Sequence, residues 1–347
     1  MTTTCLVSNY NYANFIGQAV DSALGQTLPF DEIIVVDDGS TDGSVDLLAS
    51  RYAESPTIHV VSKPNGGQLS CFNEGFAGSR GDVVFFLDAD DVYEPRYLEK
   101  TLDVYRRHPS VDFVFCGHRK FGRCDSVHLP FADDRDLGYS VILTAYLGEW
   151  IGAPTSCLSM RRHVLEKILP LPFADDWRTR ADDCLVFGAS LAGARKYCVA
   201  QPLVRYRVHG DNHFCGRSAD RFATYRRRLA INALFGHLER KLCYNVRRLA
   251  EFHHREFCTI GRPSLRQLAL YVGINMRARA SLLRRLACLA EMAGHYLRTA
   301  IWPAGGAENR ARAVDRDSTG PLHVFVPTNS AADVDAKRPR VPQRHAA

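Results

Sequence analysis

Three clusters of polar side chains each follow an apolar run of strand length. The clusters are Ser8-Asn9-Tyr10-Asn11, Asp37-Asp38-Gly39-Ser40 and Asp88-Ala89-Asp90-Asp91. In an open parallel sheet, ligands bind at the carboxyl ends of the strands. Carboxylates buried there cost desolvation free energy unless they hold a cation or accept hydrogen bonds. We therefore expect the three clusters to build one ligand site.

The Asp88-Ala89-Asp90 spacing suits a divalent cation. Mg²⁺ and Mn²⁺ take carboxylate oxygens, commonly one or two from the protein and others from substrate phosphates. A metal held in this way neutralises charge on a diphosphate leaving group. Each aspartate cluster taken alone is also compatible with a turn and a helix cap. Two such clusters at strand ends of one sheet favour a metal and phosphate site.

Strand-length and helix-length segments alternate through the first part of the chain. We expect strands at Thr4–Ser8, Glu32–Val36, Ile58–Ser62, Val83–Leu87 and Val111–Cys116, with helices between them. This alternation predicts an α/β fold with a Rossmann-like, mostly parallel central sheet.

The pattern is less regular after residue 117. We expect a strand within Trp150–Met160, helices at Arg161–Ile168 and Ala181–Ala194, and two short strands at Lys196–Val199 and Leu203–Val208. Residues 217–302 read as an almost wholly helical appendage. Residues 303–347 are rich in Pro, Gly, Ala and charge, a composition typical of disorder.

Charge is distributed unevenly along the 347 residues, whose net charge is +6. Residues 1–216 carry 20 Lys and Arg against 28 Asp and Glu, whereas residues 217–298 carry 17 against 5. The basic, Leu-rich helices suit an anionic membrane surface. They are equally compatible with a solvated helical cap. No aromatic-rich nucleic-acid motif accompanies them, so we do not expect nucleic-acid binding.

The cysteines and the N-terminus bear on the compartment. None of the 11 cysteines forms a CxxC pair, and several lie in apolar runs, which favours buried reduced thiols. The N-terminal residues lack the pattern of a signal peptide, and no run of about 18 apolar residues occurs. We expect a cytoplasmic protein, peripheral on the inner face of the membrane if the basic helices bind there.

Six segments occur in a fixed order over about residues 3–215: SNYN, EIIVVDDGSTDGS, NGGQLSCFNEGF, GDVVFFLDADD, RADDCLVFGASLAG and LVRYRVHGDN. Together they resemble the family 2 glycosyltransferases of GT-A fold. The resemblance implies an inverting transferase that moves a sugar from a nucleoside diphosphate sugar to a saccharide or lipid-linked acceptor. It also implies Mg²⁺ or Mn²⁺ and a role in surface polysaccharide or glycolipid assembly.

The resemblance divides the chain into functional parts. Residues 1–117 would bind the nucleotide sugar, and residues 118–216 would supply the acceptor site and the catalytic base within the same GT-A domain. Residues 217–302 are the basic helical region, and residues 303–347 the tail.

The resemblance also implies roles for single residues. An acceptor hydroxyl must lose a proton as it attacks the anomeric carbon, and Asp183 matches the carboxylate that takes it. Nucleotide-sugar contacts fall on Ser8, Tyr10, Asp37, Asp38 and Asp88, and metal contacts on Asp90 and His209. Supporting roles fall on Asp91 and Asp182, where many relatives have Glu in place of Asp182.

Several of these residues have a second interpretation. The Asp182-Asp183 pair could simply complement a helix dipole, and His209 could be a structural histidine. Gly66 and Gly67 allow close backbone approach to a ligand or form a plain turn. Trp150 and Trp177 offer aromatic faces for an acceptor sugar or belong to the core.

Two other functions remain open. A haloacid-dehalogenase-like phosphatase also uses Asp-x-Asp after a strand, but normally after the first strand, and here the motif follows a later one. A non-catalytic relative that binds a nucleotide sugar or polymer is the second alternative, against which the intact acidic motifs argue.

Overall fold

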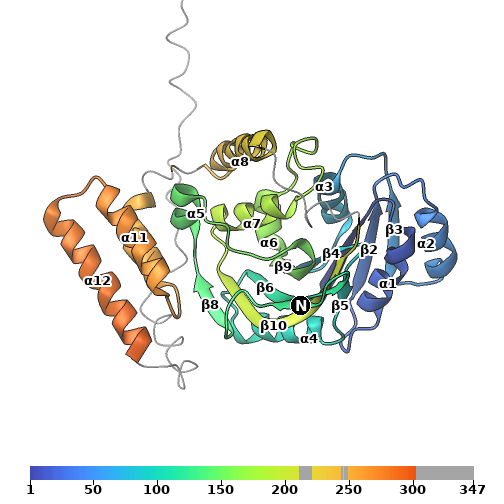
Figure 1. Cartoon of the computed structure of the whole chain (residues 1–347), viewed down its shortest axis with the longest axis horizontal. Helices are drawn as coiled ribbons and strands as arrows, with labels where there is room; N and C mark the ends of the chain where they lie inside the picture. The colour runs from blue at the N-terminus through green and yellow to red at the C-terminus, as the bar shows by residue number, and fades with distance from the viewer. Residues whose placement is uncertain (211–220, 244, 246–248, 302–347) are drawn as a thin grey trace, which may run out of the picture. The chain divides into compact units, whose positions relative to one another are not determined.

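The structure is a computed structural model, and it describes residues 1–210, 221–243, 245 and 249–301 (Figure 1). The predicted disordered tail at 303–347 lies outside these residues. So do residues 217–220 and 302 of the predicted helical region, together with its arginine pair Arg247 and Arg248.

One mixed sheet of ten strands forms the centre of the fold (Figure 1). Its strands are β1 (Thr3–Asn9), β2 (Glu32–Asp37), β3 (Ile58–Ser62), β4 (Val83–Asp88), β5 (Val92–Tyr93), β6 (Phe113–Gly122), β7 (Ser126–His128), β8 (Arg135–Gly138), β9 (Leu158–Arg161) and β10 (Lys196–Val208). The order across the sheet is β3-β2-β1-β4-β9-β6-β10-β5, with β7 paired to β6 and β8 to β10. The α/β fold with its central sheet is confirmed.

The first four strands of this order run parallel to one another. Strand β9 is antiparallel to both of its neighbours, β4 and β6, whereas β10 runs parallel to β6. Four of the five strands predicted for residues 1–117 therefore form a contiguous parallel part, and the antiparallel strand β9 separates the fifth, β6, from it.

Seven helices and one 3₁₀ turn lie along the chain between β1 and β10. They are α1 (Ala13–Leu24), α2 (Ser44–Tyr52), α3 (Gln68–Gly78), α4 (Tyr97–Arg107), α5 (Val141–Leu147), α6 (Arg162–Ile168) and α7 (Asp182–Leu191), with a 3₁₀ turn η1 (Thr155–Cys157). In β2, Ile33 and Val35 join the main core, whereas Ile34 and Val36 pack with Cys71 of α3. Because both faces are buried, the strand is apolar at every position from Ile33 to Val36.

The topology places the polar clusters side by side. Strand β1 lies between β2 and β4, so the direction in which successive strands are added reverses at β1, and such a switch point opens a crevice at the carboxyl ends. The parallel register sets Asn9 opposite Asp37 and Ser8 opposite Asp88. The three predicted clusters thus meet at one edge of the sheet.

The prediction of two short strands at Lys196–Val199 and Leu203–Val208 was wrong. Both belong to the continuous strand β10, whose pairing with β6 shifts register on either side of Pro202. Proline has no N–H to donate to the ladder, so it interrupts the hydrogen bonding without ending the strand.

The C-terminal helices pack against the sheet domain. They are α8 (Arg221–Lys241), the 3₁₀ turn η2 (Ala250–Phe252), α10 (His253–Cys258), α11 (Leu265–Arg277) and α12 (Leu282–Ile301). Helix α8 contributes Leu234 and Leu238 to the main core. Helices α10 to α12 form a second apolar cluster that includes Ile142 and Leu143 of α5.

Two further observations bear on the sequence analysis. Within the described part of the chain, no helix combines the length and the apolar character needed to cross a membrane. The cysteines of that part are all free thiols.

Glu256 of α10 joins the C-terminal helices to the sheet domain. Its carboxylate accepts hydrogen bonds from the backbone N–H groups of Ile142, at 2.9 Å, and Leu143, at 3.1 Å, in the first turn of α5. The Tyr271 hydroxyl donates to it at 2.8 Å. Burial raises the pKa of Glu256, and these donors oppose the shift.

We expect Glu256→Gln to lower the free energy of unfolding by about 1–3 kcal/mol, because an amide leaves part of this buried set of donors without an acceptor. Urea unfolding followed by circular dichroism measures the change. The matched control is Glu251→Gln, whose exposed ion pair with Arg284 contributes little. Equal stability of both variants would contradict the role given to Glu256.

Candidate active site

A cavity of about 700 Å³ lies at the carboxyl ends of β1, β2 and β4. Of the residues singled out from the sequence, those lining it are Ser8, Tyr10, Asp38, Gly67, Asp88, Asp90, Trp150 and Asp182. The structure therefore gathers residues from both halves of the predicted GT-A domain around one space.

Asp38 is held by the backbone of the predicted glycine pair. The N–H groups of Gly66 and Gly67 donate to its two carboxylate oxygens at 2.8 and 2.7 Å, and Lys63 forms an ion pair with it. Gly67 has a φ of +85°, and a Cβ there would lie 2.4 Å from the Cα of Arg178. The two glycines thus position Asp38 at the cavity wall, and only glycine fits at position 67.

Asp37 lies behind Asp38, with no exposed surface. It accepts hydrogen bonds from the side-chain amide of Asn9 and from the backbone N–H of Ser40, both at 2.9 Å. These bonds hold the loops after β1 and β2 together. The sequence predicted Asp37 as a nucleotide-sugar contact, but the residue is fully buried and is not among the cavity-lining residues, so in this structure it supports the loop of Asp38.

Asp88 lines the cavity at the end of β4. The Ser8 hydroxyl and the side-chain amide of Gln68 donate to its Oδ1 at 3.2 and 2.8 Å. Burial, together with the nearby carboxylates of Asp90 and Asp182, raises the pKa of Asp88 to about 7. The carboxylate therefore carries a destabilised negative charge that a cation or a donor group would stabilise.

Gln68 was missed by the sequence analysis. Besides Asp88, it binds the start of α7, because its Oε1 accepts from the backbone N–H of Ala181 at 2.9 Å. The available signal was its place as the first helical residue after the Asn65-Gly66-Gly67 loop. It links the Asp-x-Asp motif to the second acidic pair.

Asp90, which lines the cavity, is in contact with His209, 119 residues later in the chain, and His209 is not among the lining residues. His209 Nε2 lies 3.0 Å from Asp90 Oδ2, and each side chain is 13% exposed. Asp91 points away into the protein, where the Ser156 hydroxyl at 2.6 Å and the Arg207 backbone N–H at 2.8 Å donate to it. Burial and the charges of Asp90 and Asp88 raise the pKa of Asp91. Asp91 thus fixes the loop that presents Asp90.

The donor set at this loop fits a divalent cation. Asp88 and Asp90 bring carboxylate oxygens to one cavity, and their mutual repulsion contributes to the raised pKa of Asp88. The carboxylate ligands suit Mg²⁺ and Mn²⁺, and the imidazole of His209 is a common ligand of transition metals.

The adjacent Asp182 and Asp183 occupy different environments. Asp183, assigned as the base from the sequence, has no exposed surface and forms a bidentate pair with Arg227 of α8, both bonds at 2.9 Å. The Nε of Arg180 lies 3.4 Å from Oδ2 of the same carboxylate. Asp182 instead lines the cavity, and burial together with the charge of Asp183 raises its pKa to about 7. Of the two acids only Asp182 is among the cavity-lining residues, and the assignment of Asp183 as the base stays a prediction from the sequence.

The sequence did not indicate Arg227 as a site residue. It lies in the basic helices, whose charge we interpreted as a membrane surface or a solvated cap and not as part of the active site. Arg178 and Arg180 were also missed, although they come just before the acidic pair in the segment Arg178-Thr179-Arg180-Ala181. Both line the cavity, and the charge of Arg180 opposes the rise in the pKa of Asp182.

The two tryptophans also differ. Trp150 lines the cavity, and its indole Nε1 is buried with no hydrogen-bond partner within the described structure. Trp177 is only 2% exposed and belongs to the main core. The interpretation of Trp177 as an acceptor contact is therefore wrong, because the ring is packed against other apolar side chains.

Comparisons with known proteins bear on this geometry. Residues 4–169 match the model of the family described as glycosyl transferase family 2. An uncharacterized glycosyltransferase of Nostoc sp. is 36% identical over 226 residues, which cover 63% of this chain and 69% of that protein. A chondroitin synthase of Pasteurella multocida is 36% identical over 110 residues, and the match spans 11% of its length.

Two solved structures are similar in fold. The crystal structure of S. aureus TarS 1–349 in complex with UDP-GlcNAc superposes with a TM-score of 0.54 at 18% identity, covering 90% of this chain and 92% of that one. A longer S. aureus TarS structure gives a TM-score of 0.52 at 17% identity, covering 85% of this chain and 54% of that one.

Proposed function

Because the chain belongs to the family 2 glycosyltransferases, we propose that it moves a sugar from a nucleoside diphosphate sugar to an acceptor hydroxyl with inversion at the anomeric carbon. The observation that carries this proposal is the single cavity that joins Asp88 and Asp90 to Asp182. One part can bind a diphosphate with its counter-ion, and the other can accept a proton, which are the two requirements of the reaction.

The nucleotide end of the donor binds near β1 and β2 in this proposal. Tyr10 is 47% exposed and offers an aromatic face for a base, while Asp38 offers carboxylate oxygens at the same wall. Ser8 and Asp88 lie next to them and would contact the ribose or the sugar. The UDP-GlcNAc bound in the similar TarS fold makes a uridine nucleotide the first donor to test.

Asp90 and His209 would hold a divalent cation, with Asp88 close by. When bound, the cation supplies positive charge that stabilises the departing diphosphate. Arg178 and Arg180 at the cavity add positive charge to the same region. The acidic balance of residues 1–216 is then compatible with an anionic substrate.

We expect the purified protein with Mn²⁺ to release nucleoside diphosphate slowly from its donor by hydrolysis. EDTA should abolish release, and Asp90→Asn should lower the rate at least about 100-fold, the scale of losing one electrostatic stabiliser. The readout is a coupled assay for the nucleoside diphosphate, with donors carrying UDP, GDP and dTDP compared.

The control is Asp46→Asn, an exposed aspartate of α2, which should keep the wild-type rate. Hydrolysis of a simple phosphate ester, lost in Asp88→Asn, would instead identify the phosphatase alternative. Tight donor binding without turnover, with or without an acceptor, would identify the non-catalytic alternative.

Asp182 acts as the base in this proposal. It lines the cavity, and a pKa of about 7 lets it accept a proton from the acceptor hydroxyl near neutral pH. Asp183 stands behind it, neutralised by Arg227 and Arg180. The negative charge of Asp183 contributes to the raised pKa of Asp182, so its role is to tune and position the base.

We expect Asp182→Asn to lower kcat by about 10²- to 10⁴-fold with little change in donor binding. In the wild type, kcat should fall as the pH drops through about 7, because Asp182 becomes protonated. Asp183→Asn should keep this acidic limb but move it to lower pH, since a negative charge beside Asp182 is removed. Turnover lost in Asp183→Asn and retained in Asp182→Asn would reverse the assignment.

The acceptor is a saccharide or a lipid-linked saccharide in this proposal, consistent with assembly of a surface polysaccharide or glycolipid. Trp150 supports a saccharide acceptor, because its ring lines the cavity and offers an aromatic face to a sugar. Its buried indole N–H has no hydrogen-bond partner among the described residues and can donate to a sugar oxygen.

The C-terminal helices would hold the enzyme at the cytoplasmic face of a membrane. Helix α12 exposes Leu282, Leu283 and Leu286, which are 71, 80 and 52% exposed, next to Arg284 and Arg285. Apolar side chains beside arginines suit an interface with anionic headgroups.

We expect the protein to float with vesicles of phosphatidylglycerol and phosphatidylcholine, and less with phosphatidylcholine alone. Leu283→Glu should weaken flotation about tenfold, the scale of one buried leucine. Val127→Glu, at a 47% exposed site on β7, serves as the control. Flotation that is absent with anionic vesicles, or unchanged by Leu283→Glu, would rule out this surface.

A further inference from the structure

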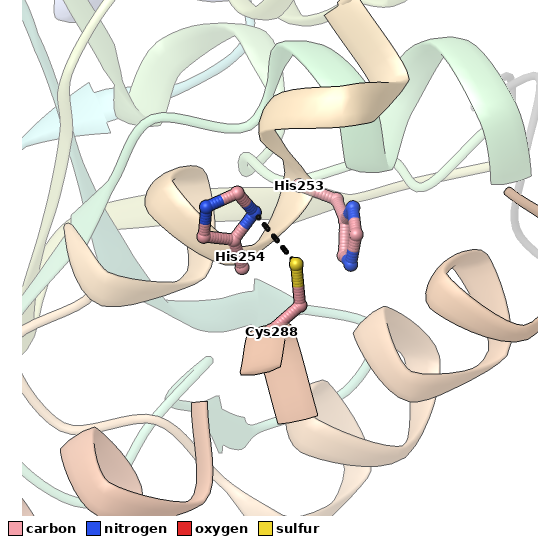
Figure 2. Close-up of side chains that lie close together, drawn as sticks. All are labelled: His253, His254 and Cys288. Atoms are coloured by element: carbon pink, nitrogen blue, oxygen red, sulfur yellow. Dashed lines mark hydrogen bonds between the residues drawn. The ribbon is translucent and has the colours of Figure 1, made fainter. Parts of the chain in front are cut away.

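His253, His254 and Cys288 converge in the C-terminal helical region (Figure 2). The two histidines begin α10, and the cysteine lies on α12, which packs against α10. One nitrogen of each imidazole and the Cys288 Sγ all lie within 4.8 Å of one another. None of the three residues lines the cavity at the carboxyl ends of β1, β2 and β4, which we call the donor cavity.

His253 presents a buried nitrogen without a partner. Its Nδ1 lies 2.8 Å from the carbonyl oxygen of Ala250, and because a carbonyl only accepts, Nδ1 carries the proton. Nε2 then carries a lone pair. The residue is 2% exposed, and Nε2 has no hydrogen-bond partner among the described residues. A histidine whose other nitrogen is fixed by a backbone carbonyl is the usual form of a metal ligand.

His254 and Cys288 complete the cluster. His254 Nδ1 lies 3.4 Å from Cys288 Sγ (Figure 2). His254 Nε2 lies 3.6 Å from a carboxylate oxygen of Glu291. The carboxylate favours the proton on Nε2, which leaves the Nδ1 lone pair directed at the sulfur.

We propose that His253 Nε2, His254 Nδ1 and Cys288 Sγ bind a Zn²⁺ ion. Two imidazoles and one thiolate are a ligand set that zinc prefers, whereas Mg²⁺ and Mn²⁺ prefer oxygen. At Zn–N and Zn–S bond lengths, tetrahedral ligand atoms lie about 3.4 to 3.6 Å apart, close to the observed sulfur-to-nitrogen distance. The Cys288 thiol proton is released to solvent on binding.

The fourth position is open to Glu291 or water. Glu291 lies one turn after Cys288 on α12, and its side chain is 49% exposed, so the carboxylate can turn toward the cluster. With Glu291 bound, the zinc would be enclosed by four protein ligands, the arrangement of a structural site.

A simple hydrogen bond from the Cys288 thiol to His254 explains only part of this geometry. It accounts for the 3.4 Å contact but leaves the buried His253 Nε2 unsatisfied, and buried polar atoms normally find a partner. A zinc ion satisfies all three atoms at once. It would also clamp α10 to α12, and α10 carries Glu256, which caps α5 of the sheet domain.

The test uses the full chain, purified under reducing conditions and dialysed with Mn²⁺ present. We expect one zinc ion per chain by elemental analysis. Replacement by Co²⁺ should give intense visible bands of a tetrahedral site and a thiolate-to-cobalt charge-transfer band. Cys288→Ser should lose the zinc and the charge-transfer band, and His253→Gln should lose the zinc.

Two controls separate this site from other metal binding. Cys258→Ser removes a nearby thiol of α10 outside the cluster and should keep the zinc. Asp90→Asn, at the donor cavity, should keep it as well. Loss of zinc in either control to the same degree as in Cys288→Ser would overturn the proposal.

X-ray absorption at the zinc edge of the wild-type protein does not depend on how the variants fold. We expect one sulfur ligand and at least two nitrogen ligands. A protein that purifies without zinc and takes up none, or a zinc ion with no sulfur ligand, would overturn the proposal.

Discussion

The site depends on one constraint. Several carboxylates lie together at the carboxyl ends of parallel strands, and each must be stabilised there. Burial disfavours charged carboxylates, and like charges near one another disfavour them further. Asp37 and Asp38 are stabilised by hydrogen bonds or an ion pair. Asp88 and Asp182 face the cavity with less compensation, and their pKa values rise to about 7. The carboxylates least compensated by the protein are therefore those that line the cavity.

The groups that stabilise these carboxylates come from distant parts of the chain. The Gly66-Gly67 backbone stabilises Asp38, Arg207 fixes the loop of Asp90 and Asp91, and Arg227 neutralises Asp183. The last of these arginines belongs to the basic region after residue 216, whose positive charge therefore also serves the acidic site. A division of the chain into an acidic catalytic part and a basic localising part is too simple, because α8 contributes to the core and to the second acidic pair.

The remaining C-terminal helices are also built into the protein rather than attached loosely. Glu256 is buried and binds the first turn of α5, and α10 to α12 share an apolar cluster with that helix. This arrangement leaves one face of α12 exposed and places His253, His254 and Cys288 on the packed side of α10 and α12. One helical region thus presents an apolar and basic surface outward and the His253, His254 and Cys288 side chains toward the contact between α10 and α12.

The sequence alone determined the local features of this protein. The apolar run of β2 and the polar clusters after β1, β2 and β4 were predicted, because strand periodicity and its termination depend on neighbouring residues. The tertiary structure decided between residues that are locally alike. Asp182 and Asp183 are adjacent acids at a helix start, and the sequence does not distinguish them. In the folded protein they differ, because Arg227 of α8 binds Asp183. Trp177, the Asp90–His209 pair and the His253–Cys288 cluster likewise depend on contacts between segments far apart in the chain, which no local pattern encodes.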